Sequence, residues 1–264
     1  MNGCRLRSDN SLNENFQPIA VNSPHDSPLL FQLRCIVDLQ LLTIYRFLSI
    51  ELKNLSGNIL DVGAGRAPWK SLLPLHVDYV GIDVYSKDDF GMANRGDILL
   101  YDGITLPFGS AEFDNAMCIE VLEHVSDPAV FLSELCRVLK PGAALFLTVP
   151  WAARIHYVPH DYHRFTRFRL KSLLESSGFS VEQILERGND IATISNKLIV
   201  LQASLLNAKN SLISIFWRIP LALLLLPLVL VFLVAAHYSI NTKRGSLTDP
   251  LGYSIIARRR FVAS

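Results

Sequence analysis

The chain has 264 residues and a formal net charge of +1. This length suits one α/β domain with an appendage. No cluster of basic residues is present to track a phosphate backbone, so we expect no nucleic-acid partner. Half of the residues are hydrophobic, and the excess is concentrated between residues 191 and 238. The four cysteines show no metal-ligand spacing, so we expect reduced and mostly buried thiols, as in a reducing cytoplasm: Cys4, Cys35, Cys118 and Cys136.

Strand-like and helix-like segments alternate through the first two thirds of the chain. Residues 1–28 are polar, lack an apolar signal-peptide core and predict a flexible N-terminal segment. Helices are predicted over residues 29–53, from Pro68, and after Ser126-Asp127-Pro128, which supplies a cap and a first-turn proline. Short apolar runs predict strands at 58–62, 78–83, 113–119 and 144–149, with a looser segment at 97–100. The alternation predicts a doubly wound, parallel α/β sheet.

A glycine-rich turn follows the first predicted strand. In Asp61-Val62-Gly63-Ala64-Gly65, the glycines allow backbone N–H groups to approach a ligand closely at a site that favours anions. Asp83 ends the second strand, 18 residues after Gly65, where an acidic side chain typically accepts hydrogen bonds from ribose hydroxyls. The third glycine of a dinucleotide fingerprint is replaced by Pro68. The pattern favours a nucleoside cofactor over a dinucleotide; the alternative is an ordinary tight turn.

Residues 59–150 carry several such motifs in order. Together they resemble class I S-adenosylmethionine-dependent methyltransferases, including the quinone-biosynthesis O-methyltransferases, through five segments: Ile59–Gly65, Val80–Asp83, Asp102–Phe108, Ile119–Val125 and Arg137–Gly142. Asp161–Thr166 and Leu251–Tyr253 are similar to bacterial methyltransferases encoded with surface-polysaccharide genes. The resemblance implies a Rossmann-like fold with S-adenosylmethionine as cofactor.

The resemblance also assigns roles to individual residues. The two glycines would face the methionine part of the cofactor, Asp83 the ribose, and Asp102 and Asp97 the adenine, although a solvated turn is the alternative for Asp97. Glu120 would lie close to the sulfonium. The predicted cofactor-binding residues are therefore Asp61, Gly63, Gly65, Asp83, Asp97, Asp102 and Glu120.

Two clusters are candidates for the chemistry. Glu120, Glu123 and His124 have the spacing that one helix would gather, and similar quinone methyltransferases hold a divalent metal with such a trio. We favour an ordinary helix start here and predict no metal site. The loop after the strand at 144–149 carries the predicted catalytic residues His160, Asp161 and His163. Histidine suits a general base at neutral pH; the alternative is a polar lid that binds substrate without proton transfer.

The last third of the chain is unusually apolar. Residues 219–240 are long enough to span a bilayer, yet Leu251–Ala257 predicts the last strand of the catalytic sheet. A single crossing would separate that strand from the sheet, so we predict a helical hairpin with arms at 191–217 and 219–240, in which Pro220 and Pro227 shape the turn and kink the second arm. The hairpin would dip into the membrane or lie in its interface; the alternative is a soluble cap or a dimer interface.

The sequence thus predicts a methyltransferase domain over residues 29–190 and 248–264, with a membrane-associated helical insert at 191–247. The expected acceptor is a saccharide or a lipid-linked saccharide. The alternatives are O-methylation of a prenylated quinone or lipid phenol, or a non-catalytic subunit that binds the cofactor. We expect the protein at the cytoplasmic face of a membrane, or otherwise in the cytoplasm, and its oligomeric state does not follow from the sequence.

Overall fold

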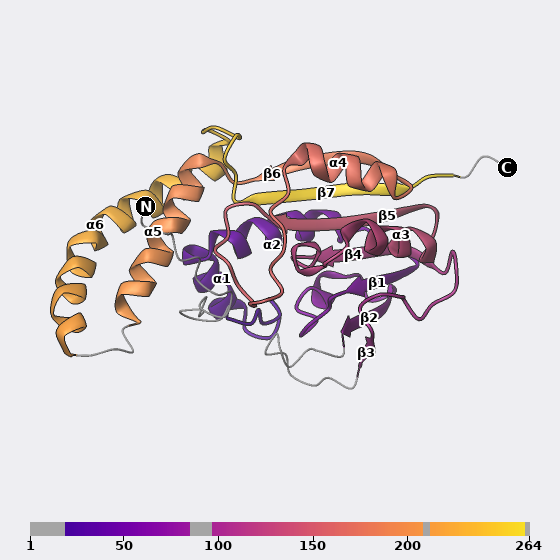
Figure 1. Ribbon diagram of the computed structural model, residues 1–264, viewed down its shortest axis with the longest axis horizontal. Helices are drawn as coiled ribbons and strands as arrows, with labels where there is room; N and C mark the ends of the chain where they lie inside the picture. The colour runs from indigo at the N-terminus through magenta and orange to yellow at the C-terminus, as the bar shows by residue number, and fades with distance from the viewer. Residues whose placement is uncertain (1–18, 85–96, 208–211, 262–264) are drawn as a thin grey trace, which may run out of the picture.

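The computed structural model describes residues 19–84, 97–207 and 212–261. These residues form a seven-stranded sheet in the order β3-β2-β1-β4-β5-β7-β6 (Figure 1). Strands β1 to β5 are parallel to one another, whereas β7 runs antiparallel between β5 and β6. The strands are β1 (Asn58–Val62), β2 (Asp78–Val84), β3 (Ile98–Tyr101), β4 (Phe113–Ile119), β5 (Leu139–Pro150), β6 (Phe179–Arg187) and β7 (Gly252–Arg259). The predicted Rossmann-like sheet is confirmed.

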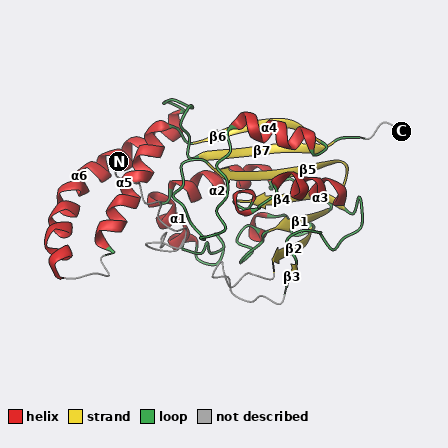
Figure 2. Cartoon of the chain, in the orientation of Figure 1, coloured by secondary structure: helices red, strands yellow, loops and turns green. Residues whose placement is uncertain are grey.

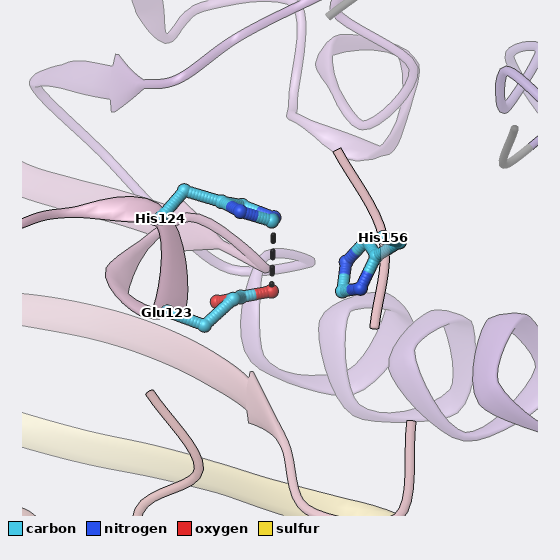
Figure 3. Close-up of side chains that lie close together, drawn as sticks. All are labelled: Glu123, His124 and His156. Carbon is cyan, nitrogen blue, oxygen red and sulfur yellow. Dashed lines mark ion pairs between the residues drawn. The ribbon is translucent and has the colours of Figure 1, made fainter. Parts of the chain in front are cut away.

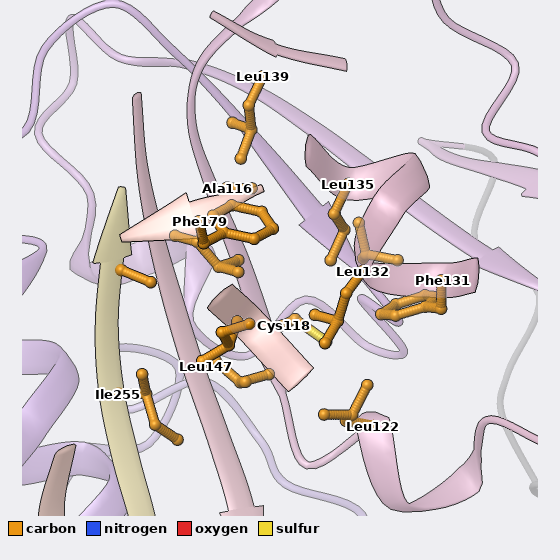
Figure 4. Close-up of a cluster of buried hydrophobic side chains, with 14 of the residues drawn as sticks. Ala116, Cys118, Leu122, Phe131, Leu132, Leu135, Leu139, Leu147, Phe179 and Ile255 are labelled. Carbon is orange, nitrogen blue, oxygen red and sulfur yellow. The ribbon is translucent and has the colours of Figure 1, made fainter. Parts of the chain in front are cut away.

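Helices cover both faces of this sheet (Figure 2). On one face, α1 (Pro28–Val37) and α2 (Leu39–Glu51) belong to a core that includes Ile59 of β1. The next residue, Leu60, points to the opposite core, to which α3 (Pro128–Val138) and α4 (Arg167–Ser176) contribute. Figure 4 shows part of this second core, where Leu132 and Leu135 of α3 pack near Cys118. Strands buried on both faces explain the near-continuous apolar runs of the sequence.

Several predicted elements differ from the structure. The helix expected over 29–53 is two helices, because Asp38 leaves helical geometry and its side chain caps α2 by accepting from Leu41 N. The helix expected from Pro68 is wrong: only a 3₁₀ turn at Lys70–Leu72 forms, and Leu73, which precedes Pro74, is extended. The looser segment at 97–100 contains strand β3, and α4 and β6 were not predicted.

The apolar insert is a helical hairpin of α5 (Asp190–Leu206) and α6 (Leu212–Thr242), which lie side by side in Figure 1. Both ends of the hairpin meet at one edge of the sheet, where Asn189 Nδ2 donates to the carbonyl of Arg244 (2.8 Å). The insert therefore returns the chain to β7, as predicted.

The predicted position of the hairpin turn is wrong. Helix α6 continues through Pro220 and Pro227, since α5 ends at Leu206 and α6 already begins at Leu212, before either proline. A proline ends a helix only when the surrounding structure does not hold the flanking turns in place. Here α5 packs along α6, and Gln202 Nε2 donates to the carbonyl of Ala222 (3.1 Å).

The segment before α1 contacts the domain. Arg34 of α1 donates to the carbonyls of Ile19 (2.8 Å) and Ala20 (2.7 Å). Residues 1–18 of the predicted flexible segment lie outside the described residues. Cys35 and Cys118 are buried free thiols, as predicted, and Cys136 is half-buried; Cys4 is outside the described part of the chain.

Candidate active site

A cleft of about 540 Å³ opens at the carboxyl edge of the sheet, beyond the ends of β1, β2 and β4. In a doubly wound sheet this edge binds ligands where the strand order reverses, here between β1 and β4. One side, which we call the cofactor wall, is formed by Asp61, Gly63, Gly65, Asp83 and Glu120. The α1–α2 junction and the loop after β5 also line the cleft, and we call their residues the acceptor wall: Arg34, Asp38, His156, Tyr157, His160 and Tyr162.

The glycine turn of the cofactor wall needs its glycines for two different reasons. Gly63 has a φ of +74°, and a Cβ added there would lie 2.3 Å from Val121 Cγ2. Gly65 has a φ of +54°, and its N–H donates to Asp83 Oδ2 (2.8 Å). Only glycine adopts such geometry at little cost, so Gly63 lets the turn pack against the Val121 side chain, and Gly65 helps to orient the Asp83 carboxylate.

The two aspartates of the cofactor wall have different environments. Asp83 also accepts from Val84 N through Oδ1 (2.8 Å), so two backbone N–H groups orient its carboxylate in the cleft. Asp61 is almost completely buried and accepts a hydrogen bond from the Tyr79 hydroxyl (2.7 Å). Burial raises the pKa of Asp61 to about 7, against the lowering effect of that hydrogen bond.

This wall fits the nucleoside cofactor that the sequence predicted. Both glycines of the turn line the cleft, and an oriented carboxylate at the end of β2 suits ribose hydroxyls. Gly63, Gly65, Asp83 and Glu120 are the residues that would hold S-adenosylmethionine here, with the Asp61 carboxyl beside them.

The two aspartates predicted near the adenine do not line the cleft. Asp97 is exposed and pairs with Lys70 Nζ at 3.6 Å. Asp102 Oδ1 accepts from the N–H groups of Ile104 (2.8 Å) and Thr105 (2.9 Å), which lowers the pKa of Asp102. Its neighbours Tyr101 and Gly103 do line the cleft. The adenine-side roles of both aspartates stay predictions.

Glu120 directly follows the last residue of β4, and its backbone is strained, with a φ of +55°. Its Oε1 accepts from Arg187 Nη2 (2.8 Å), and Arg187 is buried at the end of β6. The premise that one helix gathers Glu120 with Glu123 and His124 is wrong, because Leu122–His124 is a short 3₁₀ turn that follows this break. The Glu120 carboxylate pairs with Arg187 and stays near Glu123, because after burial its charge is the next cause that raises the pKa of Glu123.

Glu123 and His124 instead approach His156 of the facing loop (Figure 3). Glu123 is fully buried, neither carboxyl oxygen has a hydrogen-bond partner, and Oε1 lies 3.6 Å from His124 Nε2. One ligand atom from each of the three residues lies within 4.8 Å of the others, a donor set of carboxyl and imidazole groups that could hold a divalent ion. The prediction of no metal is untested by this arrangement and stays a prediction.

Burial changes the pKa of two of these three residues. It raises the pKa of Glu123 well above its usual range and lowers the pKa of His124 to about 4. His124 Nδ1 donates to the carbonyl of His160 (2.7 Å). Burial therefore favours the uncharged forms of both Glu123 and His124.

The three predicted catalytic residues have different surroundings. Asp161 forms a bidentate pair with Arg164 (2.6 and 2.7 Å) and accepts from His156 N (3.0 Å). Burial alone would raise its pKa, but the hydrogen bonds from His156 and Arg164 hold the pKa of Asp161 well below its usual range. His163 Nε2 donates to the carbonyl of Val125 (3.0 Å), and its ring stacks on Phe165. Both residues hold the loop in place, and of the three only His160 lines the cleft.

Sequence reasoning did not identify most of the acceptor wall. Arg34 and Asp38 come from the junction of α1 and α2, which the sequence pattern merged into one helix. Their spacing of four residues, which allows the observed ion pair of 3.3 Å, was the available signal. Tyr157 and Tyr162 flank the predicted histidines, and no spacing distinguishes them from ordinary loop tyrosines.

Comparisons with known proteins agree with this geometry. A family model described as a methyltransferase domain matches residues 37–184, more than half of the chain. The human mitochondrial ubiquinone biosynthesis O-methyltransferase is 36% identical over 90 residues, covering 28% of this chain and 24% of the relative. A tRNA (carboxymethyluridine(34)-5-O)-methyltransferase from Schizosaccharomyces pombe is 27% identical over 176 residues, covering 50% of this chain and 75% of that protein.

Solved structures share the fold. A chain of the complex between the Haloferax volcanii Trm112 methyltransferase activator and a methyltransferase has a TM-score of 0.51 at 13% identity, with 83% of this chain and 90% of that chain covered.

The chain belongs to the methyltransferase-domain family, with the fold of class I S-adenosylmethionine-dependent methyltransferases and S-adenosylmethionine as its cofactor. The predicted family, fold class and cofactor are thereby confirmed. The chain spans about a quarter of the length of the ubiquinone relative, and the relatives named above act on different acceptors.

Proposed function

We propose that this protein transfers a methyl group from S-adenosylmethionine to a hydroxyl of a membrane-resident lipid acceptor, with a lipid-linked saccharide as the first candidate. The observation that carries the proposal is the position of the cleft. The residues of the cofactor wall and the polar and aromatic residues of the acceptor wall line the same cleft, and the α1–α2 side contacts the apolar hairpin through Leu39, Leu42 and Leu233.

The chemistry needs few protein groups. When bound, S-adenosylmethionine supplies the electrophilic methyl group, and the protein chiefly positions the reactants. Asp83 would hold the ribose through its oriented carboxylate. Arg187 holds the Glu120 carboxylate in place at the cleft. The resemblance places the positive sulfonium of the cofactor close to this carboxylate.

The acceptor hydroxyl also has to lose a proton. His160 is the best candidate for the base, because it lines the cleft and its Nδ1 lies 3.2 Å from the Tyr162 hydroxyl. Asp161 is too acidic for this task and is bound to Arg164. We expect His160→Gln to lower kcat by roughly 100-fold while S-adenosylmethionine affinity is unchanged. Unchanged kcat would favour the alternative in which this loop is a polar lid without proton transfer.

The acceptor wall suits a sugar. Tyr157 and Tyr162 offer ring faces, and Arg34 and Asp38 offer charged hydrogen-bonding groups to hydroxyls. A prenylated quinone is the second candidate, favoured by the similarity to the human ubiquinone O-methyltransferase over 90 residues. Mass spectrometry of glycans and quinones from a strain that lacks the gene separates the two. We expect the loss of a methylated lipid-linked glycan; loss of a methylated quinone alone would reverse the order.

The hairpin supports a membrane location. Within the described residues, one helix is long and apolar enough to cross a bilayer: Phe216–Thr242, which has 27 residues and contains an 18-residue window with a mean hydropathy of 2.9. At 1.5 Å per residue it measures about 40 Å, longer than the hydrocarbon core of about 30 Å. Both ends of the hairpin join one sheet edge, so it would enter and leave from the same, cytoplasmic, side.

The outer surface of α6 suits lipid better than water. Ala222, Val229 and Ala236 are buried and recur every seven residues, so they form the seam against α5. Most of the leucines between them are exposed, including Leu224 and Leu230. A soluble cap or a dimer would also cover such a surface.

Replacing exposed leucines distinguishes these alternatives. We expect the combined change Leu224→Ser, Leu226→Ser and Leu230→Ser to release the protein from membranes and to leave S-adenosylmethionine binding intact. A wild-type protein that remains soluble and becomes monomeric only with these changes would support the dimer instead. Incorporation of labelled methyl groups into membrane extracts tests the remaining alternative, a non-catalytic subunit, which would transfer none.

A further inference from the structure

Helix α1 has two apolar faces, and the protein covers only one of them. Phe31 and Cys35 are buried against the domain. The opposite face carries five exposed apolar side chains and no charge; its residues are Leu29, Leu30, Leu33, Ile36 and Val37. Arg34, the one charged residue of α1, turns away from this face to Asp38 and to the carbonyls of residues 19 and 20. An exposed helix face of this kind usually meets a partner or a membrane.

The position of α1 beside the hairpin indicates what covers this face. His237 Nε2 of α6 donates to the carbonyl of Ile36 (2.8 Å), a group at the C-terminal end of α1 that has no partner within the helix. Just beyond α1, Leu39 is buried with Ala236 of α6, and Leu233 and Ile240 pack around them. Figure 1 shows α1 and α2 on the side of the sheet that faces the hairpin.

These contacts set the depth at which α1 would meet a bilayer. They involve residues 233–240 of α6, close to the base of the hairpin, where Lys243 and Arg244 are exposed. If the hairpin is inserted, its base lies at the lipid headgroups, where basic residues are favoured on an anionic cytoplasmic surface. The outer face of α1 is then at the level where an amphipathic helix buries its apolar residues beneath the headgroups.

We propose that the outer face of α1, formed by Leu29, Leu30, Leu33, Ile36 and Val37, docks on the surface of a phospholipid bilayer beside the hairpin and seats the mouth of the cleft at the headgroups. The inference rests on the membrane location proposed above for the hairpin. It goes further because it orients the catalytic domain: Arg34 and Asp38, at the end of the same helix, line the acceptor wall. An acceptor headgroup would therefore enter the cleft from the bilayer surface next to α1.

Tryptophan fluorescence in vesicles tests this orientation on the full chain. Native Trp217 lies exposed on α6 and reports the hairpin, by comparison with Trp217→Phe. In the Trp217→Phe background, Leu33→Trp reports the outer face of α1. Val130→Trp, on α3 across the sheet, is the matched control, because Val130 is 49% exposed and Leu33 51%. The probe is vesicles of phosphatidylcholine and phosphatidylglycerol with brominated acyl chains, which quench nearby indoles.

We expect the fluorescence added at Leu33 to be quenched at least as strongly as that of Trp217, and the fluorescence added at Val130 to be unchanged. Quenching of Trp217 without quenching at Leu33 would overturn the docking of α1 and leave the inserted hairpin in place. If neither position is quenched, the membrane location itself is wrong, and the docking of α1 with it.

A charge placed on the same face gives a second, independent result. Val37 and Val130 are both 49% exposed, so Val37→Asp and Val130→Asp expose a carboxylate at matched sites. We expect Val37→Asp to raise the vesicle concentration needed for half-maximal binding by roughly tenfold, and Val130→Asp to leave it unchanged. S-adenosylmethionine affinity, measured by calorimetry, shows that both variants are folded. Equal vesicle binding by the two variants would contradict the docking.

Discussion

The two walls of the cleft are built in different ways. The cofactor wall comes from one stretch of about sixty residues, at the ends of three adjacent parallel strands, and the hydrogen bond from Gly65 to Asp83 joins turns that neighbour each other in the sheet. The acceptor wall comes from two segments more than a hundred residues apart, at the α1–α2 junction and in the loop that follows β5. A wall made from adjacent turns can be recognised as a motif, whereas a wall made by tertiary packing can vary with the acceptor.

The difference also separates the effects of mutations. Changes in the cofactor wall should weaken S-adenosylmethionine binding and leave membrane binding intact. Changes in α1, the hairpin or the loop should affect acceptor use or membrane binding and leave cofactor affinity intact. Each of the following predictions tests one side of this division or the contact between the two.

Among the substitutions, the largest loss of folding stability is expected at Arg187, which connects the cofactor wall to helix α2. It donates to Glu120 of the cofactor wall and reaches the carbonyl of Gln40 in α2 (3.5 Å). Arg187→Met leaves Glu120 without its ion-pair partner, and we expect the free energy of unfolding to fall by about 3 kcal/mol in chemical denaturation. The exposed pair of Arg258 and Glu182 (2.6 Å) is the control, and Arg258→Met should cost less than about 1 kcal/mol. Equal losses would contradict a structural link through Arg187.

Gly63→Ala should break the cofactor wall alone. The new Cβ would clash with the Val121 side chain, and residue 63 has a positive φ that alanine adopts only with strain. The turn should therefore be displaced, and we expect S-adenosylmethionine binding to weaken by about 100-fold. Gly109→Ala is the control, because its Cβ would lie 3.4 Å from the end of the Glu112 side chain and outside the cleft lining. Calorimetry measures both. An alanine tolerated at residue 63 with normal affinity would show that the cofactor does not approach this turn.

Asp83→Ala removes the oriented carboxylate, and we expect about 30-fold weaker S-adenosylmethionine binding by calorimetry. Asp97→Ala serves as the comparison, because Asp97 is exposed and lies outside the cleft lining; we expect less than about a threefold change there. A larger effect at Asp97 than at Asp83 would place the nucleoside nearer to β3 than the cleft suggests.

Asp61 should make the free energy of unfolding of the cofactor-free protein depend on pH. Its pKa of about 7 in the folded state exceeds the unfolded value, so the folded state holds a proton that the unfolded state releases above about pH 4. The linked stability is complete below that pH and is lost as the pH rises to about 7 and beyond. Asp61→Asn should therefore gain about 4 kcal/mol relative to wild type between pH 4 and pH 8 in denaturant unfolding, because each unit of the pKa shift corresponds to about 1.4 kcal/mol. A constant difference across this range would contradict the raised pKa.

The cofactor wall was predictable because its residues act through local backbone geometry. The positive φ of Gly63 and the position of Asp83 at a strand end follow from a turn between parallel strands, which a single sequence displays. Asp97 and Asp102 show the limit of this reasoning: their spacing is compatible with the family, but their side chains form a surface ion pair and a turn cap.

The remaining features depend on contacts that sequence spacing does not reveal. Helix α6 continues through Pro220 because α5 packs beside it, and Glu120 leaves the expected helix because Arg187 of β6, an unpredicted strand, holds its carboxylate. The apolar spacing of α1 predicted a helix, and it is equally compatible with a face packed in the core and with a face on a membrane surface. Hydrophobic periodicity shows that a face is apolar and does not show what covers it.

Methyl transfer into membranes tests the central claim most directly. The purified full chain, reconstituted in vesicles with lipid extracts, is supplied with S-adenosylmethionine labelled in its methyl group, and the label is then partitioned between organic solvent and water. We predict label in the solvent-extractable lipid fraction, strongly reduced by Asp83→Ala through lost cofactor binding and by the triple leucine-to-serine change in α6 through lost membrane contact. Label found only in water-soluble products, at a rate unaffected by the α6 change, would contradict a membrane-resident lipid acceptor.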